Sequence, residues 1–128
     1  SSFLENGGYD ETYFIDLVDI EYCLRTLKNG NNVYRLNDVC MIHPIGEKTI
    51  HNIHGLKLST TNHAPLRLFY LYRNLIYLVK DYFGSFSMYL IKMCLKRVKQ
   101  IILVLVIEEN PQEKMYSIFK GLMSGFSR

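Results

Sequence analysis

Apolar side chains repeat at helical spacing in the stretch that follows residue 17. Four of them share one face of a helix, namely Ile20, Cys23, Leu24 and Leu27. Lys28 falls in the last turn, and Gly30 stands where glycine commonly ends a helix. The pattern predicts a helix from about Val18 to Asn29.

Two short stretches after this helix have the pattern of strands. Residues 32–36 (NVYRL) alternate apolar and polar side chains, and residues 39–43 (VCMIH) form a short, mainly apolar run. Residues 45–62 are polar, contain Gly46 and Gly55, and end in a run of Ser, Thr and Asn. We therefore expect a two-strand region followed by a long loop, of the kind that often carries function.

The helical pattern returns at Pro65 and is carried by residues 65–83, 85–107 and 111–126. Proline opens the first and third of these segments, and Asn110 before Pro111 is a good N-cap residue. The sequence thus predicts a mainly α chain with a short two-strand region followed by three C-terminal helices. An aromatic stripe on the first of these helices is expected to pack in the core: Phe69, Tyr70, Tyr72 and Tyr77.

Charge divides the chain of 128 residues into two unlike halves. Residues 1–62 carry a net charge of −3 and residues 63–128 a net charge of +6, which together give the overall +3. An anionic partner, such as a phosphate or a membrane surface, would favour the second half. Nucleic acid is not expected, because the one dense basic cluster, residues 92–99, lacks interleaved exposed aromatics. Three widely spaced cysteines suggest reduced thiols and a cytoplasmic protein.

The longest apolar run, residues 101–107, is far shorter than the roughly 20 residues of a membrane span. Four basic residues precede it, namely Lys92, Lys96, Arg97 and Lys99. A cationic amphipathic helix lying on an anionic membrane and an ordinary solvated helix face both fit this pattern.

The closely spaced carboxylates Asp19 and Glu21 stand where the first predicted helix begins. An acid at a helix start can accept backbone N–H bonds and interacts favourably with the helix dipole. A carboxylate kept ionised there could also serve as a general base. Spacing alone does not choose between a capping role and a catalytic one.

The segment around this pair resembles the family 2 inverting glycosyltransferases, which have the GT-A fold. Their pattern of GG, an aromatic, D-E, an acidic pair, an aromatic, CLR, Gly and then a His is matched by Gly7, Gly8, Tyr9, Asp10, Glu11, Asp19, Glu21, Tyr22, Cys23, Leu24, Arg25, Gly30 and His43. Residues 63–74 (HAPLRLFYLYRN) further resemble a stretch of the rhamnosyltransferase-like branch, although the pair Phe69–Tyr70 replaces two tyrosines. The resemblance covers roughly residues 2–82.

The resemblance implies a role for each acidic residue. Asp19 would be the general base that deprotonates the acceptor hydroxyl, so that the oxygen displaces the donor's leaving group with inversion. Glu21 would position the acceptor, with Asp10 and Glu11 on the same acceptor side. An ion pair between Glu21 and Arg25 is natural four residues apart on a helix. The sequence departs from the pattern at Val18, where most members have an acid.

The resemblance also implies a divalent metal, Mn²⁺ or Mg²⁺, with His43 completing its site. His63, Arg67 and Arg73 could contact a diphosphate or the acceptor. A second interpretation of these basic residues is a face that packs against the acidic first half of the chain, and the sequence leaves both open. Zinc binding by the pair His51 and His54 is not favoured, because no further ligands accompany them.

The family holds its nucleotide-sugar donor on an earlier βαβ region ending in D-x-D, and no D-x-D is found here. We therefore expect the C-terminal part of an α/β (GT-A) enzyme: residues 1–62 as the acceptor side of the catalytic domain and residues 63–128 as a helical extension packed on it. Alone it should not transfer sugar. It should self-associate, because such a fragment leaves strand edges exposed.

The leading interpretation is a fragment of a glycosyltransferase that transfers a sugar, such as rhamnose from deoxythymidine-diphosphate rhamnose, to a cell-surface polysaccharide or lipid-linked acceptor. It would work at the inner face of the cell membrane, with the basic helical tail near the lipid. The alternative is a non-enzymatic helical module that docks on a partner or a membrane.

Overall fold

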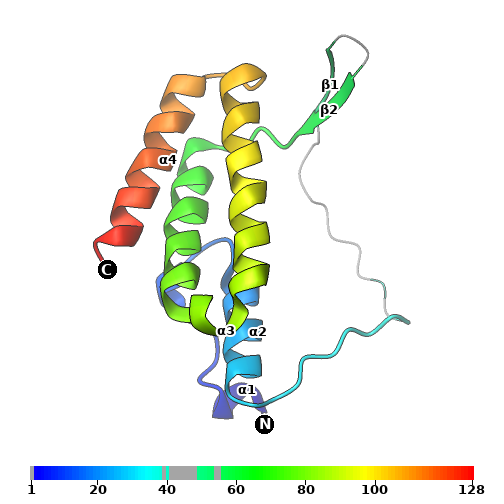
Figure 1. The fold of residues 1–128 in the computed structure, drawn as a ribbon, viewed down its shortest axis with the longest axis vertical. Helices are drawn as coiled ribbons and strands as arrows, with labels where there is room; N and C mark the ends of the chain where they lie inside the picture. Colours follow the sequence, from blue (N-terminus) through cyan, green and yellow to red (C-terminus); the bar gives the residue numbers. More distant parts are fainter. Residues whose placement is uncertain (1, 39, 41–48, 54–55) are drawn as a thin grey trace.

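The computed structural model describes residues 2–38, 40, 49–53 and 56–128. A short helix α1 (Ser2–Glu5) and a 3-10 helix η1 (Glu11–Tyr13) precede α2 (Val18–Lys28). A hairpin of β1 (Thr49–Ile53) and β2 (Leu56–Thr60) leads to the long α3 (Pro65–Val106), and α4 (Pro111–Phe126) completes the chain. The protein is thus mostly helical with one two-stranded antiparallel sheet (Figure 1).

The predicted helix at residue 18 is confirmed. It runs over Val18–Lys28, with Asn29 at its C-cap. Gly30 follows with a φ of 79° and donates its backbone N–H to the carbonyl oxygen of Leu27 at 3.1 Å. Glycine adopts this left-handed conformation without a Cβ clash, which is why the helix ends here.

The first strand was predicted in the wrong place, and the second predicted strand lies mostly outside the described residues. Residues 32–36 have no regular structure and are exposed, with Tyr34 79% accessible. Of the second predicted strand, residues 39–43, only Cys40 is described, and it has no regular structure. The observed strands lie within the predicted loop, where Thr49 pairs with Thr60 and Ile53 with Leu56. An alternation of apolar and polar side chains at residues 32–36 does not by itself supply a neighbouring strand for backbone hydrogen bonds. The two halves of the hairpin supply such a neighbour to each other.

The three predicted C-terminal helices are present, and two of them belong to α3. Phe86, with φ −133° and ψ 35°, interrupts α3 and divides it into a first limb (65–85) and a second limb (87–106). The two limbs run antiparallel, and α4 lies along the first limb (Figure 1). Pro65 and Pro111 open their helices as expected, although the Asn110 side chain makes no capping hydrogen bond.

Two glycines of α4 allow it to approach the first limb closely. A Cβ atom at Gly121 would overlap the carbonyl oxygen of Phe69, and one at Gly125 would lie 2.6 Å from the Cβ of Ile76. Both glycines are buried in this contact. Their spacing of four residues puts both on one face of α4, and backbone therefore packs directly against backbone.

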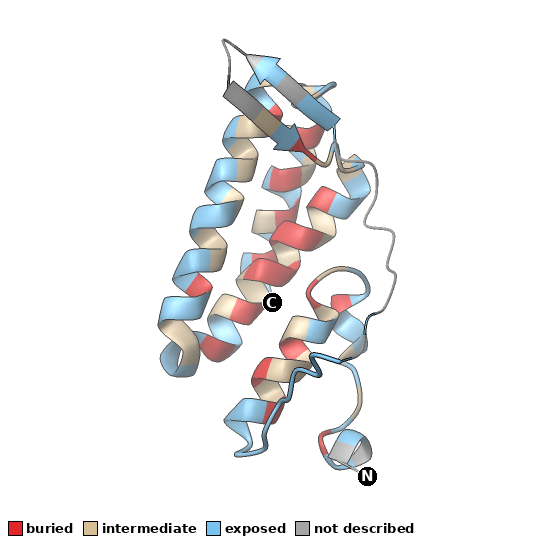
Figure 2. Ribbon diagram, turned by 90° about the vertical axis from the view of Figure 1, so that its right-hand side faces the viewer, coloured by how far each residue is buried: buried red, intermediate tan, exposed pale blue. Residues whose placement is uncertain are grey.

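Buried residues concentrate on the first limb of α3, which has neighbours on several sides (Figure 2). Four of its leucines form the centre of the core together with Leu90 of the second limb and Ile118 of α4, namely Leu68, Leu71, Leu75 and Leu78. Among the aromatic residues expected to pack there, Tyr72 is buried and donates its hydroxyl to the carbonyl oxygen of Arg97 at 2.9 Å. Phe69, Tyr70 and Tyr77 are half-buried.

Candidate functional site

Asp19 is the second residue of α2, and its side chain is exposed. Tyr89, from the second limb of α3, lies close enough that the charge of Asp19 adds to burial in raising the pKa of the Tyr89 phenol. The same two causes raise the pKa of the Cys23 thiol, one helical turn further along α2. An exposed carboxylate in the first turn of a helix interacts favourably with the helix dipole.

Glu21 points to a different side of α2 from Asp19, since two residues are separated by about 200° around a helix. It is 3% exposed. Its carboxylate accepts hydrogen bonds from Arg25 Nε at 3.0 Å and Nη2 at 3.1 Å and from the Tyr82 hydroxyl at 2.6 Å. The predicted ion pair with Arg25 is therefore confirmed. Both oxygens of this carboxylate therefore already have hydrogen-bond partners. Contact between Glu21 and an acceptor stays a prediction.

Arg25 also fixes the N-terminal segment onto α2. Its guanidinium donates to the carbonyl oxygens of Asn6 and Gly8, each at 2.5 Å. Gly7 and Gly8 have φ values of 79° and 67°, and a Cβ atom at Gly7 would lie 3.2 Å from Arg25 Nη1. The two glycines of the motif thus serve this turn.

Asp10 and Glu11 lie at the start of η1. The Asp10 carboxylate accepts hydrogen bonds from the Thr12 backbone N–H at 2.9 Å and the Thr12 hydroxyl at 2.7 Å. Partial burial raises the pKa of Asp10, but these hydrogen bonds and the charges of Arg128 and Arg25 outweigh it, so the pKa lies below its ordinary value. Asp10, Glu11 and Glu21 line one polar hollow of about 670 Å³. The predicted acceptor residues are therefore brought together, but Asp19 is not among the lining residues of that hollow.

The loop that leads into α2 has an unusual backbone. Phe14, Asp16 and Leu17 have φ values of 54°, 61° and 64°, and residues other than glycine rarely adopt such positive values. Such a conformation persists only where its surroundings enforce it. Here the buried amide of Asn74 enforces it by donating to the carbonyl oxygens of three loop residues, Tyr13 at 2.7 Å, Ile15 at 2.8 Å and Asp16 at 2.9 Å.

Arg73 supports the same loop from the first limb of α3. Its guanidinium donates to the carbonyl oxygen of Thr12 at 2.5 Å and lies 4.7 Å from the ring centre of Tyr70. Arg73 and Asn74 together position the loop, and through it the start of α2 that carries Asp19. The sequence identifies Arg73 and Asn74 as polar residues of a helix, but it gives no sign of their contacts with the loop before α2.

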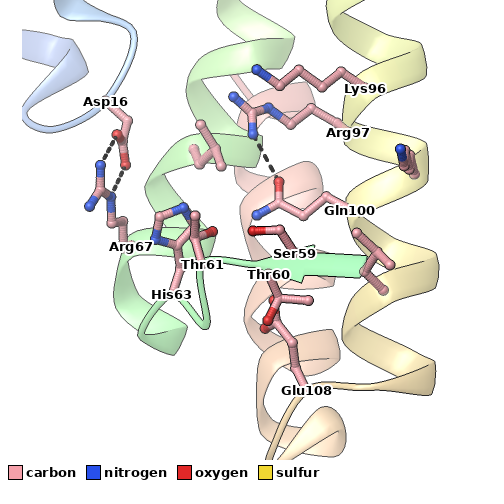
Figure 3. Close-up of a pocket in the computed structure, with 13 residues that line it drawn as sticks. Asp16, Ser59, Thr60, Thr61, His63, Arg67, Lys96, Arg97, Gln100 and Glu108 are labelled. Atoms are coloured by element: carbon pink, nitrogen blue, oxygen red, sulfur yellow. Dashed lines mark hydrogen bonds and ion pairs between the residues drawn. The ribbon is translucent and has the colours of Figure 1, made fainter. Parts of the chain in front are cut away.

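Arg67 forms a two-bond ion pair with Asp16, with Nε–Oδ2 and Nη2–Oδ1 distances both 2.9 Å (Figure 3). The contacts of Arg67 and Arg73 agree with the interpretation in which a basic face packs against the acidic first half. Contact with a diphosphate or an acceptor stays a prediction for both. His63 lies beside Arg67 in a separate cleft, where burial first, and then the charge of Arg67, lower its pKa.

The predicted metal ligand His43 lies outside the described residues. Within residues 2–38, 40, 49–53 and 56–128, no three His, Cys, Asp or Glu side chains are grouped to hold a metal ion. The divalent metal therefore stays an expectation.

Comparison with curated proteins gives one clear similarity. The chain is 40% identical over 74 residues to the dTDP-rhamnosyl transferase RfbF of Shigella flexneri, a stretch that makes up 58% of this chain and 24% of that protein. No protein-family model matches, and no solved structure matches at a significant level. The chain spans about a quarter of the length of this relative. Over the matched stretch, it is related to a rhamnosyltransferase-like glycosyltransferase.

Proposed function

We propose that this chain forms the acceptor side of a glycosyltransferase that transfers rhamnose from dTDP-rhamnose to a polysaccharide or lipid-linked glycan, in a GT-A enzyme that inverts the configuration of the sugar. The observation that carries the proposal is the 40% identity over 74 residues to a dTDP-rhamnosyl transferase. Identity at this level supports a shared reaction class.

In this proposal Asp19 is the general base. Its exposed carboxylate accepts the proton of an acceptor hydroxyl, and the acceptor oxygen forms a bond to the anomeric carbon of rhamnose. The bond from that carbon to the diphosphate oxygen breaks, and dTDP leaves with the electron pair. A base contributes to rate only when it is held in place, and the contacts of Asn74 and Arg73 to the loop before α2 provide this.

The polar hollow beside α2 is proposed to bind a part of the acceptor glycan away from the reacting hydroxyl, since Asp19 lies on another side of the helix and does not line the hollow. Asp10 and Glu11 offer carboxylate oxygens that sugar hydroxyls can donate to. Glu21 contributes by holding the guanidinium of Arg25 in an ion pair and by accepting a hydrogen bond from the hydroxyl of Tyr82, a residue of α3.

An exposed apolar stripe favours a membrane location, at the cytoplasmic face of the cell membrane. On the second limb of α3 the stripe comprises Met88, Ile91, Leu95, Val98, Ile102 and Leu105, all at least 41% exposed. Their alternating spacing of three and four residues puts them on one side of the helix. Lys92, Lys96 and Lys99 run along one border of the stripe, which suits an anionic bilayer surface. No helix in the described part of the chain has both the length and the hydropathy to cross a bilayer.

The catalytic proposal is tested in the protein that carries this chain, by transfer of labelled rhamnose from dTDP-rhamnose to glycans in a membrane extract of the source cells. Asp19→Asn should reduce turnover about 10²–10⁴-fold, the usual contribution of a general base. Asp38→Asn, at another exposed acid, is the matched control and should leave turnover unchanged. Near-normal turnover of the Asp19 variant would remove Asp19 from this role.

The membrane proposal is tested separately with vesicles. Leu95→Asp should weaken binding to vesicles that contain anionic lipid without lowering the thermal midpoint of unfolding, because Leu95 is 64% exposed. Loss of dimers instead of vesicle binding in this variant would show that the stripe joins two copies of the chain. Rhamnose transfer that fails for every variant and for the parent, together with intact vesicle binding, would favour the non-enzymatic docking module.

A further inference from the structure

A cleft of about 410 Å³ lies between β2 and the two limbs of α3. Its volume falls in the range of small-molecule sites, roughly 300–1,000 Å³. In Figure 3, Lys96, Arg97 and Gln100 extend from the second limb, while Ser59 and Thr60 of β2, Thr61 and His63 close the other side. The residues come from three separate parts of the chain.

The cleft carries an excess of positive charge. Its two acids are already neutralised, because Asp16 pairs with Arg67 and Glu108 with Lys114, whose Nζ lies 2.8 Å from Glu108 Oε2. Lys96, Arg97 and Lys99 have no carboxylate within ion-pair distance among the residues that the structure describes. Three cations therefore face a partly enclosed space without a counter-charge.

Arg97 is the most constrained of these cations. Its Nη1 donates to Gln100 Oε1 at 2.9 Å, which fixes the plane of the guanidinium. Its Nε is buried and has no hydrogen-bond partner in the described part of the chain. A buried N–H donor without a partner is unfavourable in the folded protein, and an acceptor oxygen of a bound anion that reaches it would satisfy it. The guanidinium is also the group best suited to phosphate, through two parallel N–H···O bonds.

We propose that this cleft binds a phosphate-bearing anion of diphosphate size, with Arg97 as the anchor and Lys96 and Lys99 as the surrounding positive charge. Hydroxyl groups of Ser59 and Thr61 are available at the edge to donate to the outer oxygens. The site does not depend on the proposed glycosyl transfer, because Asp19 and the hollow that contains Glu21 are separate from it. A diphosphate could come from a free molecule or from the head group of a lipid, and the same chemistry would recognise both.

The test is isothermal titration of the full protein with inorganic pyrophosphate at low ionic strength. Arg97→Gln should weaken binding about 10-fold or more, the usual effect of losing a charged hydrogen bond. Lys96→Gln should weaken it less, and Lys120→Gln, on the exposed side of α4, should not change it. A second variant, Arg97→Lys, keeps the charge but not the planar fork, and it should bind more weakly than the parent. Thermal unfolding of each variant establishes that it is folded.

A competition arm separates the two sources of diphosphate. If pyrophosphate releases the protein from vesicles that carry a diphosphate-headed lipid, the head group shares the cleft. If it binds in solution without affecting vesicle binding, the ligand is a free diphosphate. Failure of the parent to bind pyrophosphate, equal binding by Arg97→Gln, or binding to an RNA oligonucleotide alone would overturn the proposal.

Discussion

The side-chain amide of Asn74 donates a hydrogen bond at 2.7 Å to the carbonyl oxygen of Tyr13, 61 residues earlier in the chain. Asn74 is fully buried, and the same nitrogen also reaches the carbonyl oxygens of Ile15 and Asp16. Asn74→Ala should therefore lower the free energy of unfolding by about 2–4 kcal/mol, since it leaves buried acceptors without a donor. Urea unfolding followed by far-UV circular dichroism measures this. Asn37→Ala, at an exposed asparagine, should change the free energy by less than about 0.5 kcal/mol.

The pair of Tyr82 and Tyr13 offers a contrast between two buried hydroxyls. Tyr82 donates to Glu21 at 2.6 Å, whereas the Tyr13 hydroxyl has no hydrogen-bond partner among the described residues. Tyr82→Phe should lower the free energy of unfolding by about 1.5–3 kcal/mol, the value of a hydrogen bond to a charged group. Tyr13→Phe should be neutral or stabilising by up to about 1 kcal/mol. Equal losses in the two variants would mean that the Tyr13 hydroxyl is satisfied.

The helices could be predicted because their signals are local. Pro65 and Pro111 mark helix starts, Gly30 marks a helix end, and apolar spacing marks the faces. The strands could not be placed, because a strand depends on its partner as well as on its own alternation. The break at Phe86 has no signal at that residue, and the nearest breaker, Gly84, lies within the helix.

The candidate site was predictable in its residue types but not in its arrangement. Asp19 and Glu21 are neighbours in sequence, yet helical geometry turns them to different sides, so only one of them is exposed. The support of the loop by Asn74 spans about half the chain, and no local pattern reports such a contact. The cationic cleft likewise combines β2 with the distant second limb of α3.

The close contact of α4 with the first limb of α3 predicts different results for two glycine substitutions. Gly121→Ala should lower the free energy of unfolding by about 2–3 kcal/mol, because its methyl group would meet the backbone of Phe69 and force the helices apart. Gly84→Ala should be neutral or stabilising by up to about 1 kcal/mol, because nothing lies within 4 Å and alanine favours the helix. Thermal and urea unfolding compare them. A harmless Gly121→Ala would show that α4 does not pack through its glycines.

Stability should depend on pH through His63. Burial, and then the charge of Arg67, lower the pKa of His63 in the folded protein, although Asp16 and Glu108 oppose this and Arg97 adds to it. The unfolded chain therefore takes up the proton at a higher pH than the folded chain, at about 6.5. The contribution of His63 to the free energy of unfolding should be complete above that pH. It should decrease as the pH falls toward the pKa of His63 in the folded protein.

The measurement for this last prediction is urea unfolding at a series of pH values between about 5 and 7, above the range in which ordinary carboxyl groups titrate. His63→Gln cannot take up a proton, so its free energy of unfolding should decrease less than that of the parent as the pH falls. Equal slopes in the two proteins would mean that the environment of His63 does not disfavour its charge. A parent that becomes more stable as the pH falls would mean that a carboxylate, Asp16 or Glu108, binds the protonated ring in the folded state.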